Sequence, residues 1–208
     1  MHTQTVSEER LNALTHTIGA FLGAIGLVLL LLKDSYKTKF SQVGILVYGS
    51  SIILLFTASA IYHWVTNQRL KQKLRVLDHV SIYVLIAGTY TPVLVINLLD
   101  GNGVLLLIAV WAIATVGTIM KLFFTGRFEV FSTLLYLVMG WLIVIDFSAL
   151  KEAVPFNGLL YLAAGGLFYT FGIIFYAIEK IPYNHVIWHL FVMAGAISHY
   201  LMILNYVV

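Results

Sequence analysis

The sequence predicts an all-α integral membrane protein, built as a bundle of seven transmembrane helices. Hydrophobic residues make up 61% of the 208 residues and charged residues 10%, whereas soluble proteins average about 45–50% and about 25%. The mean hydropathy of the chain is +0.95. A soluble fold of this length cannot bury so much apolar surface, so the chain is expected to lie in a bilayer.

Seven stretches of the chain are long and apolar enough to cross the hydrocarbon core, which takes about 20 helical residues. They are residues 14–32, 43–64, 78–97, 103–124, 130–148, 157–178 and 183–206. The pieces between them are too short to fold as a soluble domain. We therefore expect residues 1–208 to form a single membrane domain.

The first three spans have distinctive ends. The first follows a polar segment with two glutamates, which lacks the basic start of a signal peptide, so this span is expected to remain in the protein. The second span ends at His63 and Trp64. The third begins at Asp78 and contains Pro92, which is expected to kink it.

The later spans carry fewer polar residues. The fourth and fifth flank a short connection with Lys121 and Arg127 near its ends. The sixth has a patch of small residues, Ala163 to Gly166, which could pack against a helix of the same chain or of a second copy in a homo-oligomer. The seventh contains no lysine.

Lysine and arginine are distributed unevenly between the two sides of the predicted bundle. The side of the amino terminus has eight, which are Arg10, Arg69, Lys71, Lys73, Arg75, Lys121, Arg127 and Lys180. The other side has four, which are Lys33, Lys37, Lys39 and Lys151. Because short cytoplasmic loops are enriched in these residues, we expect a cytoplasmic amino terminus and an outside carboxyl terminus in the cell (plasma) membrane.

The same composition excludes several classes of protein. The chain has no cysteine, which excludes disulfides and thiolate metal sites. The net charge of +3 comes from residues that set the topology, so no nucleic-acid partner is expected. A G-protein-coupled receptor has its amino terminus outside, and a retinal protein needs a lysine in its last helix; neither fits this chain.

Ionisable side chains inside a span are costly unless they are paired or ligated, so each one is a functional candidate. The topology places four of them at one level, toward the cytoplasmic side. They are His63 at the end of the second span, Asp78 at the start of the third, and His185 and His189 in the first turns of the seventh.

These four residues have the chemistry of a metal site. His185 and His189 are four residues apart, which places both imidazoles on one face of a helix, about 6 Å apart. His63 would add a third nitrogen and leave one position open, as at catalytic zinc ions. Asp78 could orient a water molecule or take a proton from it, and Ser59 could donate a hydrogen bond into the site.

Each residue also has an interpretation without a metal. The pair of histidines could form hydrogen bonds between helices, His63 could lie at the membrane interface, and Asp78 could cap a helix. His16 and His79 are expected at the interface, although His16 could also approach the site. His199 is expected to be a polar contact inside the bundle.

Several dispersed motifs together resemble a known family. They are ERLNALTH (residues 9–16), the spacing of Ser59 and His63, the segment LDHVSIYVLIAGTYTP that contains Asp78, and HVIWH followed by His199. Along essentially its whole length, the chain resembles the hemolysin III branch of the progestin and adipoQ receptor family.

The resemblance implies seven spans, a cytoplasmic amino terminus and a zinc ion. In the adiponectin receptors of that family, the ion is held by one histidine of the second span and two of the seventh, and the aspartate opening the third span contacts it through water. Matched by motif, these residues are His63, His185, His189 and Asp78, and Ser59 matches the serine before the first histidine. The receptors have a long amino-terminal extension that this chain does not match, so hormone reception is not implied.

Three functions are consistent with these residues. The first is an intramembrane zinc-dependent hydrolase of a lipid amide or ester, similar to the alkaline ceramidases of the wider superfamily, with a membrane lipid as its substrate. The second is a cytolytic or pore-forming protein, as the family's name suggests. The third is a lipid sensor with structural zinc, in which a basic loop from Val65 to Leu77 binds anionic head groups or a protein partner.

Overall fold

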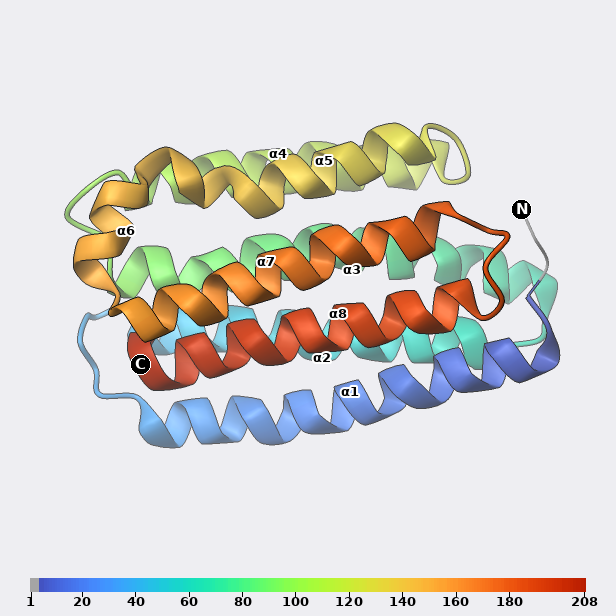
Figure 1. Cartoon of the computed structure of the whole chain (residues 1–208), viewed down its shortest axis with the longest axis horizontal. Coiled ribbons are helices and arrows are strands. Elements are labelled where there is room, and N and C mark those ends of the chain that lie inside the picture. The colour runs from blue at the N-terminus through green and yellow to red at the C-terminus, as the bar shows by residue number, and fades with distance from the viewer. Residues whose placement is uncertain (1–3) are drawn as a thin grey trace.

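The structure is a computed structural model and describes residues 4–208. Seven long helical segments lie side by side in one bundle (Figure 1). They are α1 (Val6–Lys33), α2 (Ser41–Trp64), α3 (Gln68–Ile96), α4 (Gly103–Phe124), α5 (Glu129–Trp141) continued by η1 (Leu142–Asp146) and α6 (Phe147–Ala153), α7 (Phe156–Ala177), and α8 (Asn184–Met202) continued by η2 (Ile203–Val207). Residues 4–208 contain no strand, and all seven segments are long and apolar enough to cross a membrane. The predicted all-α fold with seven spans is confirmed, and its orientation in the membrane stays a prediction.

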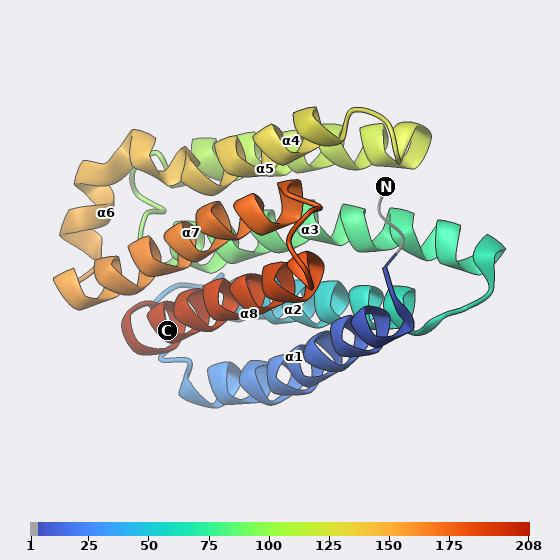
Figure 2. The same ribbon diagram turned by 45° about the vertical axis from the view of Figure 1, so that its right-hand side comes forward.

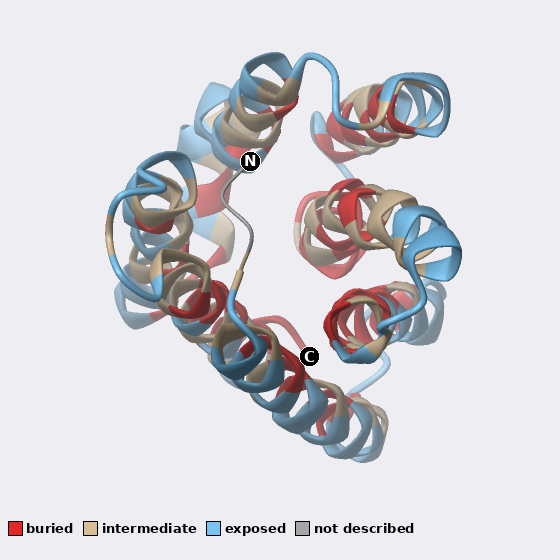
Figure 3. Ribbon diagram, turned by 90° about the vertical axis from the view of Figure 1, so that its right-hand side faces the viewer, coloured by how far each residue is buried: buried red, intermediate tan, exposed pale blue. Residues whose placement is uncertain are grey.

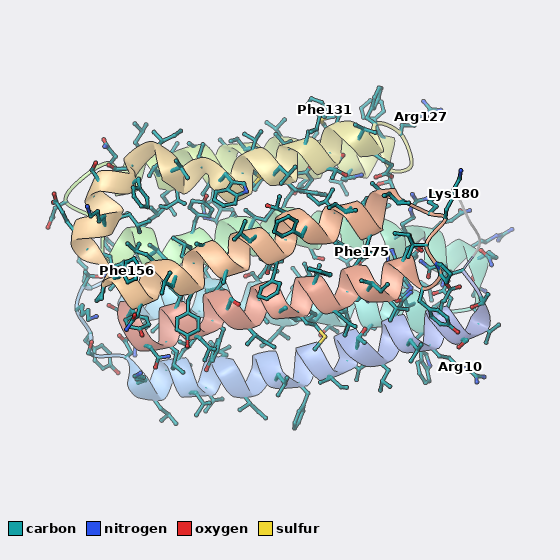
Figure 4. All side chains as sticks on the ribbon, viewed as in Figure 1. Arg10, Arg127, Phe131, Phe156, Phe175 and Lys180 are labelled. Atoms are coloured by element: carbon teal, nitrogen blue, oxygen red, sulfur yellow. The ribbon has the colours of Figure 1, made fainter. Side chains whose placement is uncertain are left out.

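The outer surface of the bundle is apolar. The buried faces of the helices point toward the middle of the bundle and the exposed faces point outward (Figure 3). Large apolar side chains cover the outward faces, among them Phe131 and Phe156, which are 51% and 72% exposed (Figure 4). Such a surface would be costly in water, but it matches the hydrocarbon core of a bilayer.

Successive spans alternate in direction. The start of α1, the end of α2 and the starts of α3 and α8 therefore lie at the same end of the bundle, which we call the amino-terminal end (Figures 1 and 2). Arg10, Arg127 and Lys180 also lie at this end (Figure 4). α3 packs against α2 and α4, while α8 packs against α7 and α1.

Two helices extend beyond the expected spans because their polar first turns are capped. Thr5 and Glu8 form a reciprocal capping box at the start of α1. Asn67 caps α3 by accepting a hydrogen bond from the N–H of Leu70 at 3.1 Å. The segment from Val65 to Leu77 is therefore not the loop that the sequence predicted, since it is helical from Gln68 onward. Hydropathy marks the hydrocarbon core, and a capped polar helix can continue past it.

The fifth span changes from an α-helix to a 3₁₀-helix at Leu142. At this change, the hydroxyl group of Tyr90 in α3 forms hydrogen bonds with backbone groups of the fifth span. The Tyr90 hydroxyl donates to the carbonyl of Met139 at 2.7 Å and accepts from the N–H of Ile143 at 2.9 Å. This contact fixes the inner wall of the bundle at Gly140 and Trp141, which line the cavity described below.

Candidate metal centre and cavity

Three histidines from two helices meet at the amino-terminal end of the bundle. His63 lies in the last turn of α2, and His185 and His189 lie in the first two turns of α8. One nitrogen of each lies within 4.8 Å of the other two, and the ring centroids are 4.7–5.2 Å apart. We call these three residues the histidine cluster. The structure thus brings together the three residues that the sequence singled out as metal ligands.

The nitrogens of the histidine cluster suit a metal ion. The Nε2 atom of His63 is buried and has no hydrogen-bond partner among residues 4–208, and such an unpaired atom costs about 1–3 kcal/mol in a protein interior. A bound ion would supply the missing partner. Three imidazoles that face one another are also the ligand set of catalytic zinc sites, in which a fourth position stays open.

The other nitrogen of His63 is held by α1. Nδ1 lies 2.7 Å from Oε2 of Glu9, and Nζ of Lys71 lies 2.9 Å from Oε1 of the same carboxylate. Lys71 also donates to the carbonyl of Tyr62 at 3.2 Å, and its Nζ lies 4.9 Å from the centroid of the Tyr62 ring. Glu9 therefore joins α1, α2 and α3 beside the histidine cluster.

The first turns of α1 also contact His189. The ring of His16 stacks on the ring of His189, with centroids 3.6 Å apart and planes 6° from parallel. The Thr15 hydroxyl oxygen lies 3.4 Å from Nδ1 of His189. The expectation that His16 lies at the membrane interface is wrong, because His16 is only 3% exposed and belongs to the buried face of α1.

Asp78 and Ser59 lie beside the histidine cluster. Asp78 is inside α3, ten residues after Gln68, so the interpretation of Asp78 as a helix cap is wrong and Asn67 has that role. Ser59 is buried in α2 one turn before His63, and its side chain lies next to the Asp78 carboxylate. A carboxylate and a hydroxyl thus line the same cavity as His189.

A cavity of about 120 Å³ extends from His189, one member of the histidine cluster, into the bundle. Ser59, Asp78 and His189 line one end, and Trp141 and His199 line the other. Because His199 follows His189 by ten residues of helix, the two ends are about 15 Å apart. The remaining walls come mainly from apolar and aromatic side chains of α3, α5, α7 and α8, which are Ile82, Leu85, Ile86, Tyr90, Tyr136, Leu137, Tyr169, Ile173, Tyr176, Trp188 and Val192.

His199 is the polar contact inside the bundle that the sequence predicted. One of its ring nitrogens, Nε2, lies 3.2 Å from the carbonyl oxygen of Leu162 in α7. Gly165 leaves the space for this ring, because a Cβ at Gly165 would overlap the His199 imidazole. Within the small-residue patch of α7, Gly165 therefore packs against a helix of its own chain.

A second polar cluster lies at the same end of the bundle, between α3, α4 and α5. Glu129 accepts from Lys121 at 2.6 Å and from Arg75 at 3.2 Å, and Nδ1 of His79 lies 3.8 Å from Oε2 of Glu129. His79 is 9% exposed and Lys121 is 1% exposed. The expectation of an interfacial His79 is therefore wrong, since its buried ring turns toward the partly exposed carboxylate of Glu129.

Glu9 was not predicted as a partner of the histidine cluster, although it belongs to the motif ERLNALTH. The spacing of polar residues in this motif indicates such a partner. Glu9 and His16 are seven residues apart, which places them on the same face of a helix, and Asn12 between them is polar and fully buried. Three polar residues on one face of a membrane helix indicate that this face meets another polar group.

Comparison with known proteins agrees with the fold and the motifs. The model of the haemolysin-III related family matches residues 4–200. The chain is 43% identical to Hemolysin-3 of Bacillus cereus over 206 residues, which cover 99% of this chain and 94% of that protein. It is 41% identical to the Hemolysin-3 homolog of Bacillus subtilis (strain 168) over 205 residues, which cover 98% of this chain and 96% of that protein.

A more distant relative is the human monocyte to macrophage differentiation factor. The two chains are 30% identical over 211 residues, which cover 97% of this chain and 85% of the human protein. The resemblance that the sequence motifs indicated is confirmed: this chain is a multi-pass membrane protein that belongs to the haemolysin-III related family.

Proposed function

We propose that the protein is an intramembrane hydrolase that cleaves a lipid amide or ester with a zinc ion held by His63, His185 and His189. The observation that carries this proposal is the position of the histidine cluster at one end of an apolar cavity, with Asp78 and Ser59 in the adjoining wall. These three imidazoles would hold the ion, which would supply Lewis-acid chemistry at the scissile carbonyl.

Asp78 and Ser59 have separate roles in this proposal. The Asp78 carboxylate orients the attacking water and accepts its proton, which it later delivers to the leaving amine or alcohol. The Ser59 hydroxyl donates a hydrogen bond to the oxygen of the scissile carbonyl as negative charge develops there. Both residues line the cavity beside His189, so they can reach a carbonyl bound at that end.

The cavity suits a lipid substrate. Its walls are mainly apolar and include both His189 and His199, which the helical rise places about 15 Å apart, so apolar atoms of a lipid could lie against them while its carbonyl lies beside His189. In the orientation predicted from lysine and arginine, the histidine cluster lies on the cytoplasmic side of the cell membrane. The scissile bond would then lie near the level of acyl linkages in the inner leaflet.

Turnover of fluorogenic lipid amides and esters by purified protein in detergent micelles tests the proposal. We expect the wild type to release fatty acid, and His185→Ala to abolish the release together with zinc binding. Asp78→Asn should keep its zinc and lose at least about a hundredfold in turnover, as expected for loss of a general base. The exposed Glu152, at the opposite end of the bundle, gives the matched control Glu152→Gln, which should behave as the wild type.

A cytolytic function is the second candidate, because two relatives carry the name hemolysin. The two candidates differ in a simple assay. Dye release from liposomes at low protein-to-lipid ratio, unchanged by His185→Ala, would favour lysis over hydrolysis. Wild-type protein with one zinc per chain and no turnover of any lipid amide or ester would contradict the hydrolase.

A lipid sensor with structural zinc is the third candidate. Its expected binding surface is smaller than the sequence predicted, because Lys71 and Arg75 form ion pairs with Glu9 and Glu129. Arg69 and Lys73 remain exposed on the first turns of α3, where they could meet anionic head groups. A lipid-dependent protein partner, captured equally by the wild type and by Asp78→Asn, would favour this function.

A further inference from the structure

Glu9 controls which nitrogen of His63 is available to the histidine cluster. The distance of 2.7 Å between Nδ1 and Oε2 of Glu9 is that of a strong, charge-assisted hydrogen bond. A carboxylate can only accept in such a bond, so Nδ1 carries the proton. The neutral ring then has its lone pair on Nε2, the buried nitrogen that has no partner in the protein.

Lys71 keeps the Glu9 carboxylate charged and in place. Its ammonium group lies 2.9 Å from the second oxygen of Glu9. It also contacts both the carbonyl and the ring of Tyr62, the neighbour of His63 in α2. The carboxylate therefore has a fixed partner on each oxygen, and its position relative to His63 is determined by three helices.

We propose that Glu9 is a positioning residue of the zinc site: it accepts the Nδ1–H of His63 and thereby directs the Nε2 lone pair toward the ion. A carboxylate behind a ligating histidine fixes the tautomer and the ring orientation, and raises the basicity of the ligand. This inference rests on the proposed function only in that the histidine cluster binds zinc.

The affinity of the purified protein for zinc, measured by competition with a chelator, tests the role of Glu9. Glu9→Gln keeps the shape and the acceptor but removes the charge, and Glu9→Ala removes both. We expect zinc binding to weaken by about tenfold to a hundredfold, more in Glu9→Ala than in Glu9→Gln. Lys71→Met should have a smaller effect in the same direction, and Glu152→Gln should have none.

The melting temperature with and without zinc separates positioning from a purely structural role. We expect added zinc to raise the melting temperature of Glu9→Gln by less than it raises that of the wild type, each compared with its own metal-free form, because loss of the ion pair with Lys71 alone would lower both forms of the variant equally. Equal zinc affinities of the wild type, Glu9→Gln and Glu9→Ala would overturn the inference and leave the proposed zinc site intact. Wild-type protein that binds no zinc would instead overturn the proposed function and, with it, this inference.

Discussion

His16 of α1 lies flat on His189 of α8, with the two imidazole centroids 3.6 Å apart. Both ring nitrogens of His16 are buried and have no hydrogen-bond partner in the part of the chain that the structure describes, and the side chain lines the cavity. Unpartnered buried polar groups are rare in native proteins and often mark functional sites. His16 is therefore placed to hydrogen-bond the polar group of a molecule bound in the cavity next to the histidine cluster.

His16→Phe is expected to keep the ring stack while removing both unpartnered nitrogens. The melting temperature should stay the same or rise, because a buried polar atom without a partner costs about 1–3 kcal/mol. Zinc content should not change, and lipid turnover should fall at least about tenfold, which corresponds to about 1.4 kcal/mol of transition-state stabilisation. Unchanged turnover in a variant that holds its zinc would show that His16 does not contact the substrate.

Gly165→Ala and Gly166→Ala form a matched pair in α7. A methyl group at Gly165 would overlap the His199 ring, whereas one at Gly166 would meet Trp141 at an ordinary 3.4 Å. We expect Gly165→Ala to lose about 1–3 kcal/mol of stability through overpacking, and Gly166→Ala to lose little. The melting temperatures of both variants, measured by thermal unfolding in detergent, test this expectation. Equal melting temperatures would contradict the packing of α7 against α8 described above.

Lys121→Met removes the buried member of an ion pair whose other member, Glu129, has a side chain that is 25% exposed and also pairs with Arg75. We expect a loss of about 1–3 kcal/mol, less than for a fully buried pair, because Glu129 keeps Arg75 and contact with solvent. The double variant Lys121→Met/Glu129→Gln should recover part of this loss, since it removes both charges. Titration with a denaturing detergent measures the free energy of unfolding of the wild type, the two single variants and the double variant. A double variant that loses the sum of the two single losses would show that the pair is not coupled.

The sequence was sufficient to predict which of the candidate site residues lie at the same level along the axis of the bundle. Hydropathy marks where a span begins and ends, and each helical residue then advances about 1.5 Å along the axis. His63, His185 and His189 could be placed at one level on that basis, and the structure brings them together.

The direction in which each side chain points could not be predicted in the same way. The rotation of a helix about its axis depends on its neighbours, and an apolar span in lipid has only a weak pattern that distinguishes its faces. His16 and His79 were expected at the interface, and both turn inward to partners on other helices. Glu9 was missed because it precedes the predicted span 14–32, whereas the helix begins at Val6 and brings Glu9 beside His63.

Metal analysis of the detergent-purified protein, expressed with zinc in the medium, tests the zinc site most directly. We predict one zinc ion per chain in the wild type and in Asp78→Asn, and none in His63→Ala or His185→Ala. Wild-type protein without zinc, or a full complement of zinc in both histidine variants, would contradict the site.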